Sequence, residues 1–203
     1  MKTRELAVEG AFEFTPTFHP DDRGRFLSPY QENAFVEALG HPIFRVAQTN
    51  HSVSRRGVVR GVHYTATPPG SAKYVYCARG RALDYVVDLR IGSPTFGRWD
   101  VVTMDQDDHR ATYFPVGVGH AFVALEDDTV MSYMLSGSYV PENELALSVF
   151  DQDLRLELPE DLEPVLSQRD RAAITLAEAR AEGLLPDYDR CRRLERETVP
   201  LAG

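Results

Sequence analysis

The sequence predicts an all-β fold, an antiparallel sandwich or barrel with a few short flanking helices, on two observations. First, short runs of β-branched and aromatic residues recur between about residues 43 and 150, a pattern typical of packed antiparallel strands. Second, turn signals containing Gly and Pro separate these runs, as expected for short strands with tight connections. The expected strands cover residues 44–50, 57–65, 73–80, 82–90, 99–104, 111–116, 121–126 and 130–135.

Two helices are predicted from their end signals. Residues 31–39 predict a helix because Gly40 follows them as a C-terminal stop. A second helix is predicted near the C-terminus, where Thr175 and Glu178 form a capping box and Gly183 ends the segment. We therefore expect the helices to flank the strand-rich region rather than to alternate with its strands.

Turn signals and alternation place the polar side chains of the expected strands. Arg79-Gly80 is expected to be a hairpin tip, and residues 68–70 and 92–94 are expected loops. Successive residues of a strand point to opposite faces, so polar residues share faces with apolar ones. The shared faces hold Lys73, Val75 and Cys77; Asp84, Val86 and Asp88; and Met131, Tyr133 and Leu135. These faces either line a polar barrel interior or are ordinary solvent-facing strand surfaces, and alternation alone leaves both open.

Composition limits the classes of function. The chain has 203 residues, of which 43% are hydrophobic and 26% charged, which is ordinary globular usage. The formal net charge of −9 argues against nucleic acid or an anionic membrane as a main partner. It still permits a local basic pocket for an anionic small molecule. We expect one domain over residues 1–203, with a solvated, partly frayed tail at 189–203.

The compartment is predicted from what the sequence does not contain. Only two cysteines, Cys77 and Cys191, are present, too few for a disulfide framework. No apolar run approaches the roughly 20 residues that span a bilayer. The N-terminal stretch carries acidic residues where a secretory signal would be apolar. These features predict a cytoplasmic protein.

Two histidines lie where a cupin barrel would bind a metal. Pro115, Gly117 and His120 fit the pattern P-x-G-x-x-H of such barrels, although this match alone is weak. His63 is followed by Tyr64 and Thr65, so the usual second histidine is missing, and no carboxylate follows at the expected spacing. Two histidines make a poor zinc or iron site. The chain therefore looks like a cupin-type β-barrel that has lost its metal site.

Without a metal, His63 has three possible roles: a hydrogen-bonded core histidine, a ligand contact or a general base. Arg60 precedes it by three residues, a spacing that normally places two side chains on opposite faces of a strand. Gly61 lies between them and could mark a bulge that brings both residues to one face.

Taken together, several ordered motifs resemble a known family. The chain is similar to the dTDP-4-dehydro-6-deoxyglucose epimerases, which include the 3,5-epimerases of the rhamnose pathway and relatives in antibiotic-sugar pathways. This resemblance implies a metal-free cupin-type jelly roll that needs no cofactor, is usually a homodimer and acts on a dTDP-4-keto-6-deoxysugar. The stretches that carry it are 22–26, 48–52, 56–64, 69–73, 84–97, 117–122 and 167–170, together with Tyr133 and Tyr139.

The resemblance also implies roles for four residues in the reaction. A 4-keto group acidifies the C–H bonds at C3 and C5, so inversion needs a base, an acid on the opposite face and a group that stabilises the enolate. His63 corresponds to the base and Asp170 to its orienting partner. Lys73 corresponds to the cation beside the enolate oxygen, and Tyr133 to the acid.

Further residues match nucleotide or sugar contacts of the family. Arg23 and Arg60 correspond to diphosphate contacts, and arginine can bind phosphate oxygens through two parallel hydrogen bonds. Ser28 stands where many double epimerases have Glu, and Ser28 to Gln31 also form a possible helix start. Asp84 and Asp88 are predicted to face inward, with at least one supporting a histidine. The remaining matched positions are Gln48, Asn50, His120, Tyr139, Glu144 and Arg169, the last replacing a frequent Lys.

Other functions remain open at this stage. A 3,4-ketoisomerase of the same family also uses a histidine in a cupin barrel, although the pairing of Tyr133 and Asp170 with His63 argues against it. A non-catalytic cupin would bind the dTDP-sugar without exchanging sugar protons with solvent, and a metal-dependent cupin oxygenase would contain metal. Within the epimerases, the sequence leaves open whether C3, C5 or both carbons are inverted, and in which pathway.

Overall fold

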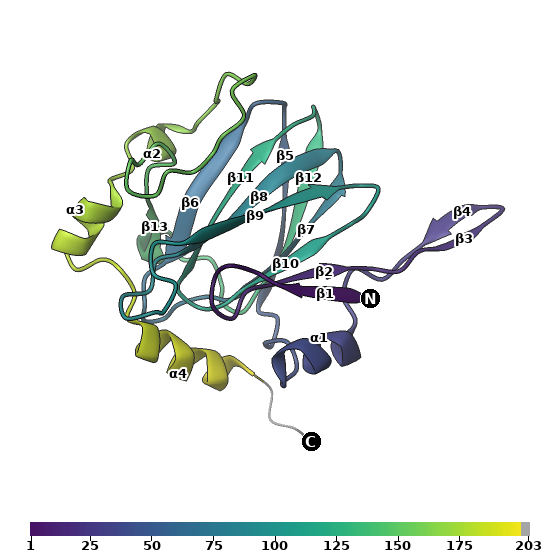
Figure 1. Ribbon diagram of the computed structural model, residues 1–203, viewed down its shortest axis with the longest axis horizontal. Helices are drawn as coiled ribbons and strands as arrows, with labels where there is room; N and C mark the ends of the chain where they lie inside the picture. Colours follow the sequence, from purple (N-terminus) through teal and green to yellow (C-terminus); the bar gives the residue numbers. More distant parts are fainter. Residues whose placement is uncertain (200–203) are drawn as a thin grey trace.

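The computed structural model describes residues 1–199, which form two antiparallel sheets around a common interior (Figure 1). One sheet has six strands, in the order β1 (Lys2–Glu5), β2 (Phe12–Thr15), β10 (Ala111–Phe114), β7 (Lys73–Arg79), β12 (Thr129–Leu135) and β5 (Gln48–Ser54). The other has five, in the order β13 (Glu144–Ala146), β6 (Val59–Thr65), β11 (Val118–Ala124), β8 (Arg81–Asp88) and β9 (Trp99–Asp105). This arrangement is the predicted cupin-type jelly roll.

The interior between the sheets is apolar at one end and polar at the other. Val75, Cys77 and Met131 from the six-stranded sheet pack with Val86 and Phe122 from the five-stranded sheet. Strand alternation explains this core, because Lys73 and Asp84 lie on the same faces as these apolar residues. The predicted polar faces therefore point into the barrel, and the solvent-facing alternative is excluded for them.

Additional layers cover the outer faces of both sheets. Apolar residues of the segment 147–185 pack on the outer face of the five-stranded sheet, and this segment contains α2 (Gln168–Arg171) and α3 (Leu176–Ala181). The six-stranded sheet is covered by α1 (Glu32–Leu39) and α4 (Tyr188–Thr198), which contribute Phe35 and Cys191 to a third apolar cluster. A short 3₁₀ turn, Pro141–Asn143, precedes β13. None of the helices in residues 1–199 has the length and apolar character needed to cross a membrane.

Both predicted helices form with the expected end signals. Helix α1 ends at Gly40, whose φ of 78° is left-handed, and α3 begins with the predicted capping box of Thr175 and Glu178. The alternative helix start at Ser28 does not form, because α1 begins at Glu32 and its N-cap is Gln31. The helices thus lie outside the barrel, as the sequence predicts.

The expected frayed tail is instead helix α4 as far as Thr198. Asp187 caps this helix by accepting a hydrogen bond from the Arg190 backbone, and Cys191 is fully buried against the sheet. Glu195 accepts a short hydrogen bond from Tyr113 of β10. The prediction of a frayed tail was wrong for residues 189–198 because one face of this charged segment docks on the barrel. Residues 200–203 lie outside the described part of the chain.

The N-terminal strands were not predicted. Strand β1 is exposed at all four positions, and β3 (His19–Asp21) and β4 (Gly24–Phe26) form an exposed hairpin, so none of them carries a buried apolar face. This hairpin extends away from the two large sheets (Figure 1). Of the predicted strand 44–50, only the part from Gln48 is extended in a ladder. The Arg79-Gly80 hairpin tip joins β7 to β8 as predicted.

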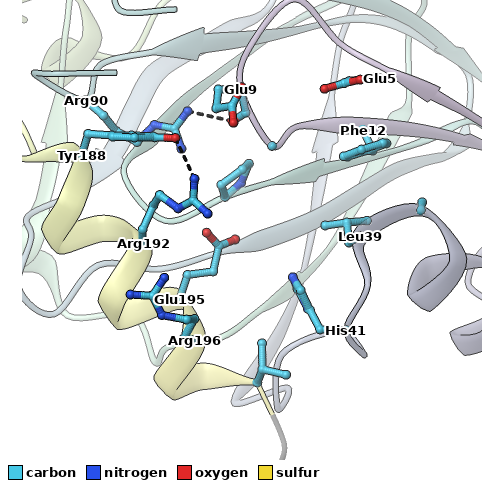
Figure 2. Close-up of a pocket in the computed structure, with 14 residues that line it drawn as sticks. Glu5, Glu9, Phe12, Leu39, His41, Arg90, Tyr188, Arg192, Glu195 and Arg196 are labelled. Carbon is cyan, nitrogen blue, oxygen red and sulfur yellow. Dashed lines mark hydrogen bonds between the residues drawn. The ribbon is translucent and has the colours of Figure 1, made fainter. Parts of the chain in front are cut away.

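One large cavity lies outside the barrel. It has a volume of about 570 Å³ and is bounded by α4, the end of α1 and the β1–β2 hairpin (Figure 2). Its buried cation, Arg90, already binds Asp88 at 2.9 Å and the Glu9 carbonyl at 2.8 Å. Arg192 donates to the Tyr188 hydroxyl at 3.1 Å. No predicted site residue lines this cavity.

Candidate active site

The predicted catalytic residues gather at a second cavity, which opens from the barrel interior. Its volume is about 540 Å³, and both sheets contribute to its walls. Strand β6 and strand β11 supply His63 and His120 from one side, whereas β7 and β12 supply Lys73 and Tyr133 from the other. The cavity therefore presents different titratable groups on two opposing walls.

A bulge in β6 brings Arg60 and His63 to the same wall. His63 pairs with His120 and Arg60 pairs with Phe122, so three steps on β6 match two steps on β11. Gly61 provides the extra residue, with a φ of +119°, and a Cβ there would lie 2.4 Å from the His120 carbonyl oxygen. Only glycine fits this position, and the predicted bulge is confirmed.

His63 is paired with Asp170 from helix α2. The distance from His63 Nε2 to Asp170 Oδ1 is 2.6 Å, and the Ser167 hydroxyl donates to Asp170 Oδ2 at 2.8 Å. Burial raises the pKa of Asp170, but the hydrogen bonds from His63 and Ser167 and the charge of Arg169 outweigh it, so the pKa is lowered. An ionised carboxylate thus supports an imidazole whose Nδ1 has no hydrogen-bond partner within residues 1–199.

A second His–Asp pair lies directly beside the first. His120 Nε2 lies 2.5 Å from Asp84 Oδ1, and both side chains are buried, with 6% and 0% exposed. Burial lowers the pKa of His120 and raises that of Asp84, against the attraction between the two groups. Burial therefore disfavours the charged form of each partner. Asp84 supports a histidine as predicted, whereas Asp88 binds Arg90 away from the cavity.

Lys73 and Tyr133 form the opposite wall. Lys73 is only 8% exposed, and burial lowers its pKa although the carboxylates of Glu144 and Asp84 partly oppose this. Burial also raises the pKa of Tyr133, while Ser52 and Arg60 act in the opposite direction. Tyr133 therefore keeps its proton throughout the ordinary working range of pH.

Most of the other predicted contact residues also line this cavity. Arg60 is held by a 3.3 Å hydrogen bond from its Nε to Ser54, and Glu144 accepts from Thr65 at 3.0 Å. The predicted residues on the lining are Asn50, Arg60, His63, Lys73, His120, Tyr133, Tyr139, Glu144 and Arg169. Asp170 lies behind His63 and lines the adjoining cleft.

Three predicted contact residues are not brought to the cavity of their own chain. Arg23 lies in the turn between β3 and β4, where its side chain is 90% exposed and paired with Asp21 at 2.6 Å. Ser28 follows the same hairpin without entering the cavity. Gln48 uses its side chain within the protein, donating to Asn50 at 2.7 Å and accepting from the Tyr139 backbone at 2.8 Å.

Several lining residues were missed by the sequence analysis. Ser52 shares the inner face of β5 with Asn50, so alternation from Asn50 would have identified it. Phe122 and Leu135 follow on the inner faces of β11 and β12 in the same way. Further lining residues that carry no distinctive signal are Thr49, His51, Thr65, Ser71, Gly137 and Ser138.

The donors around the cavity do not form a metal site. Within residues 1–199, no group of three or more His, Cys, Asp and Glu side chains is arranged to hold a metal ion. Each of the two histidines has one ring nitrogen hydrogen-bonded to a carboxylate, which leaves one nitrogen per ring. The arrangement instead suits proton transfer, because a carboxylate-supported imidazole on one wall faces a protonated phenol and the Lys73 side chain on the other.

Comparisons with known proteins agree with this geometry. The model of the dTDP-4-dehydrorhamnose 3,5-epimerase family matches residues 5–178. A dTDP-4-dehydro-6-deoxyglucose 3-epimerase from Streptomyces bikiniensis is 49% identical over 183 residues, covering 90% of this chain and 93% of that protein. The rmlC epimerase of Mycobacterium tuberculosis, a solved structure, is 44% identical, with a TM-score of 0.92 and coverage of 98% of this chain and 100% of that one. ChmJ, a 3′-monoepimerase from Streptomyces bikiniensis in complex with dTDP-quinovose, is 47% identical, with a TM-score of 0.89 and coverage of 95% and 97%.

Proposed function

Because the chain belongs to the dTDP-4-dehydrorhamnose 3,5-epimerase family, and so is an isomerase, we propose that it epimerises a dTDP-4-keto-6-deoxyhexose at C3, C5 or both. The product would serve the biosynthesis of rhamnose-like or antibiotic deoxysugars. The observation that carries the proposal is the opposition of His63, backed by Asp170, to Tyr133 across one cavity. Inversion at carbon needs a base and an acid on opposite faces of the sugar ring.

In the proposed reaction, His63 removes a proton from the carbon beside the 4-keto group. Nδ1 accepts the proton while Nε2–H donates to Asp170, whose negative charge stabilises the imidazolium that forms. The electron pair of the broken C–H bond moves to the keto oxygen and gives an enolate. Tyr133 then delivers its proton to the other face of the same carbon, and the configuration is inverted.

The enolate is stabilised by Lys73. Lys73 supplies a compact positive charge from within the cavity wall, and a charge placed there before the reaction needs no reorganisation during it. His120, fixed by Asp84, offers its other ring nitrogen to the substrate. The nucleotide end of the substrate is bound by Arg60, whose guanidinium suits a diphosphate.

The active form in this proposal is a homodimer that completes each site with the hairpin of the partner. The hairpin β3–β4 is exposed, Phe26 is 68% exposed, and Arg23 does not line the cavity of its own chain. The β3–β4 hairpin of one protomer would then bring Arg23 to the diphosphate bound by the other. This accounts for a family-matched phosphate contact that lies far from its own site.

Mixing two impaired variants tests the dimer. Arg23→Ala and His63→Ala subunits are refolded together, so that mixed dimers contain one site with an intact His63 and an intact Arg23 from the partner. Recovery of activity is expected above that of either variant alone. No recovery in a mixture shown to contain mixed dimers would mean that Arg23 does not act across the interface.

The reaction itself is tested by incubating the protein with dTDP-4-keto-6-deoxyglucose in heavy water. Nuclear magnetic resonance reports which carbons take up deuterium and whether their configuration changes. Deuterium at C3 alone, at C5 alone or at both gives the site of epimerisation. Binding of the dTDP-sugar without any exchange would identify a non-catalytic binding protein, and a shift of the keto group to C3 would identify a ketoisomerase.

A further inference from the structure

The hydroxyl of Tyr133 has one hydrogen-bond partner within residues 1–199, the hydroxyl of Ser52. The two oxygens are 3.1 Å apart, and both residues line the active-site cavity. Tyr133 lies on β12 and Ser52 on β5, the edge strand of the six-stranded sheet. Since Asn50 is the register partner of Tyr133, the hydrogen bond runs diagonally between the strands.

The contact matters because Tyr133 carries a negative charge after it gives up its proton. Burial makes this phenolate costly and raises the pKa of Tyr133, whereas a hydrogen bond from Ser52 favours the phenolate. Tyrosine also has rotatable side-chain bonds, so a fixed partner determines where its hydroxyl points. Ser52 is partly buried, and its hydroxyl can donate to the phenolate as readily as it accepts from the phenol.

We propose that Ser52 is a positioning residue for the acid of this epimerase. Its hydroxyl holds the Tyr133 oxygen toward the sugar face opposite His63, and it donates a hydrogen bond to the phenolate formed when the proton leaves. In this step the Tyr133 O–H bond breaks as a C–H bond forms at the enolate carbon, and the oxygen keeps the electron pair. Water then returns a proton to Tyr133, and His63 releases its proton to water. This inference rests on the proposed function.

The same two strands provide a matched control. Ser132 and His51 are register partners, and alternation points their side chains to the opposite face of the β5–β12 ladder from Tyr133 and Ser52. Ser132 Oγ lies 2.8 Å from His51 Nδ1. Ser132→Ala therefore removes a serine hydrogen bond between β5 and β12 but leaves the hydrogen bond between Tyr133 and Ser52 in place. A purely structural contribution of Ser52 would be reproduced by this control.

The experiment measures both inversion and deuterium uptake in heavy water for Ser52→Ala, Ser52→Thr and Ser132→Ala. Hydrogen bonds to charged groups are worth enough that loss of the Ser52 hydroxyl should slow inversion about 10- to 100-fold. Deuterium uptake should fall less, because His63 still forms the enolate, so the ratio of uptake to inversion rises. Ser52→Thr keeps a hydroxyl and should restore most of the inversion, and Ser132→Ala should leave the ratio unchanged.

A comparison with Tyr133→Phe separates this inference from the proposed function. The double variant Ser52→Ala/Tyr133→Phe should invert no more slowly than Tyr133→Phe, because Ser52 acts through Tyr133. If Tyr133→Phe loses inversion but Ser52→Ala keeps the wild-type ratio, the role of Ser52 is overturned and the function stands. If Tyr133→Phe keeps full inversion, the acid assignment fails and the role of Ser52 fails with it. Binding of dTDP to each variant confirms that the site is folded.

Discussion

The two His–Asp pairs of the cavity consist of the same side chains at nearly the same distance, 2.6 Å for His63–Asp170 and 2.5 Å for His120–Asp84. They are neighbours in the sheet, since His63 and His120 are register partners. Their surroundings differ, because the His63 side chain is 29% exposed whereas His120 and Asp84 are buried within the barrel.

Because of this difference, the pKa values of the two carboxyl groups shift in opposite directions. The pKa of Asp170 is lowered because Ser167 and Arg169 add to the contact with His63, whereas burial raises the pKa of Asp84. A pair with a stable carboxylate can support an imidazolium and suits a base. A pair in which burial disfavours both charges suits a fixed hydrogen-bonding group. Similar geometry therefore serves two different tasks in the proposed mechanism.

The largest expected effect comes from removing the two imidazoles in turn. His63→Ala should lower the rates of deuterium uptake and epimerisation roughly 10²- to 10⁴-fold, because that is the usual contribution of a positioned general base. His120→Asn should lower both by a smaller factor, because Lys73 still stabilises the enolate. Both rates are measured in heavy water, with dTDP binding as the control for an intact site. Equal losses in the two variants would contradict the assignment of His63 as the base.

The next effect contrasts the carboxylates. Asp170→Asn should slow deuterium uptake about 100-fold, because the imidazolium loses its charged partner. Asp84→Asn should slow it far less, since the amide can still accept a hydrogen bond from His120 and burial already disfavours the charge of Asp84. The measurement is the rate of solvent exchange at saturating substrate. A larger loss for Asp84→Asn would reverse the comparison.

The pH dependence should sharpen the contrast between the walls of the cavity. Burial lowers the pKa of Lys73, so as pH rises its ammonium group should lose its proton before the usual lysine pKa of about 10.4 is reached. The pKa of Tyr133 is raised, so Tyr133 should not contribute to this loss. We expect kcat/KM to fall on the alkaline side in the wild type, and the fall to move to higher pH in Lys73→Arg. An unchanged alkaline profile in Lys73→Arg would assign it to another group.

The smallest effect is on folding stability. Folding lowers the pKa of Asp170. Its contribution to the free energy of unfolding is therefore present above the unfolded-state pKa of about 3.9 and is lost as pH falls through the folded-state pKa. Folding raises the pKa of Asp84, so its contribution to the free energy of unfolding declines as pH rises above its pKa in the unfolded chain. At pH 7, Asp170→Asn should lower the free energy of unfolding by about 1–3 kcal/mol. Asp84→Asn should be neutral or stabilising there, as denaturant titration would measure.

The barrel strands could be predicted from the sequence because burial leaves a pattern in them. Strands such as β7, β8 and β12 combine β-branched and aromatic residues with regular alternation, and their inward faces were identified correctly. Strands β1, β3 and β4 carry no buried side chain, so they leave no such pattern. Helix α4 has a charged sequence whose docking depends on the sheet beneath it, and local patterns do not encode that contact.

The site was less predictable than the fold. The Gly61 bulge and the support of a histidine by Asp84 followed from strand alternation, and both are confirmed. The pairing of His63 with Asp170 came only from the family resemblance, since 107 residues separate them. Arg23 lies on an exposed hairpin away from the cavity of its own chain, and a motif match carries no information about that tertiary position.

The long separation between His63 and Asp170 has a consequence for biosynthesis. A ribosome that has exposed the last barrel strand has released both histidines, Lys73 and Tyr133, but not α2. Until residues 163–171 emerge and lie along the start of β6, the base has no carboxylate behind it. Full activity of the nascent chain would therefore begin only after this late segment docks, so the full catalytic rate reports the docking of α2 rather than closure of the barrel.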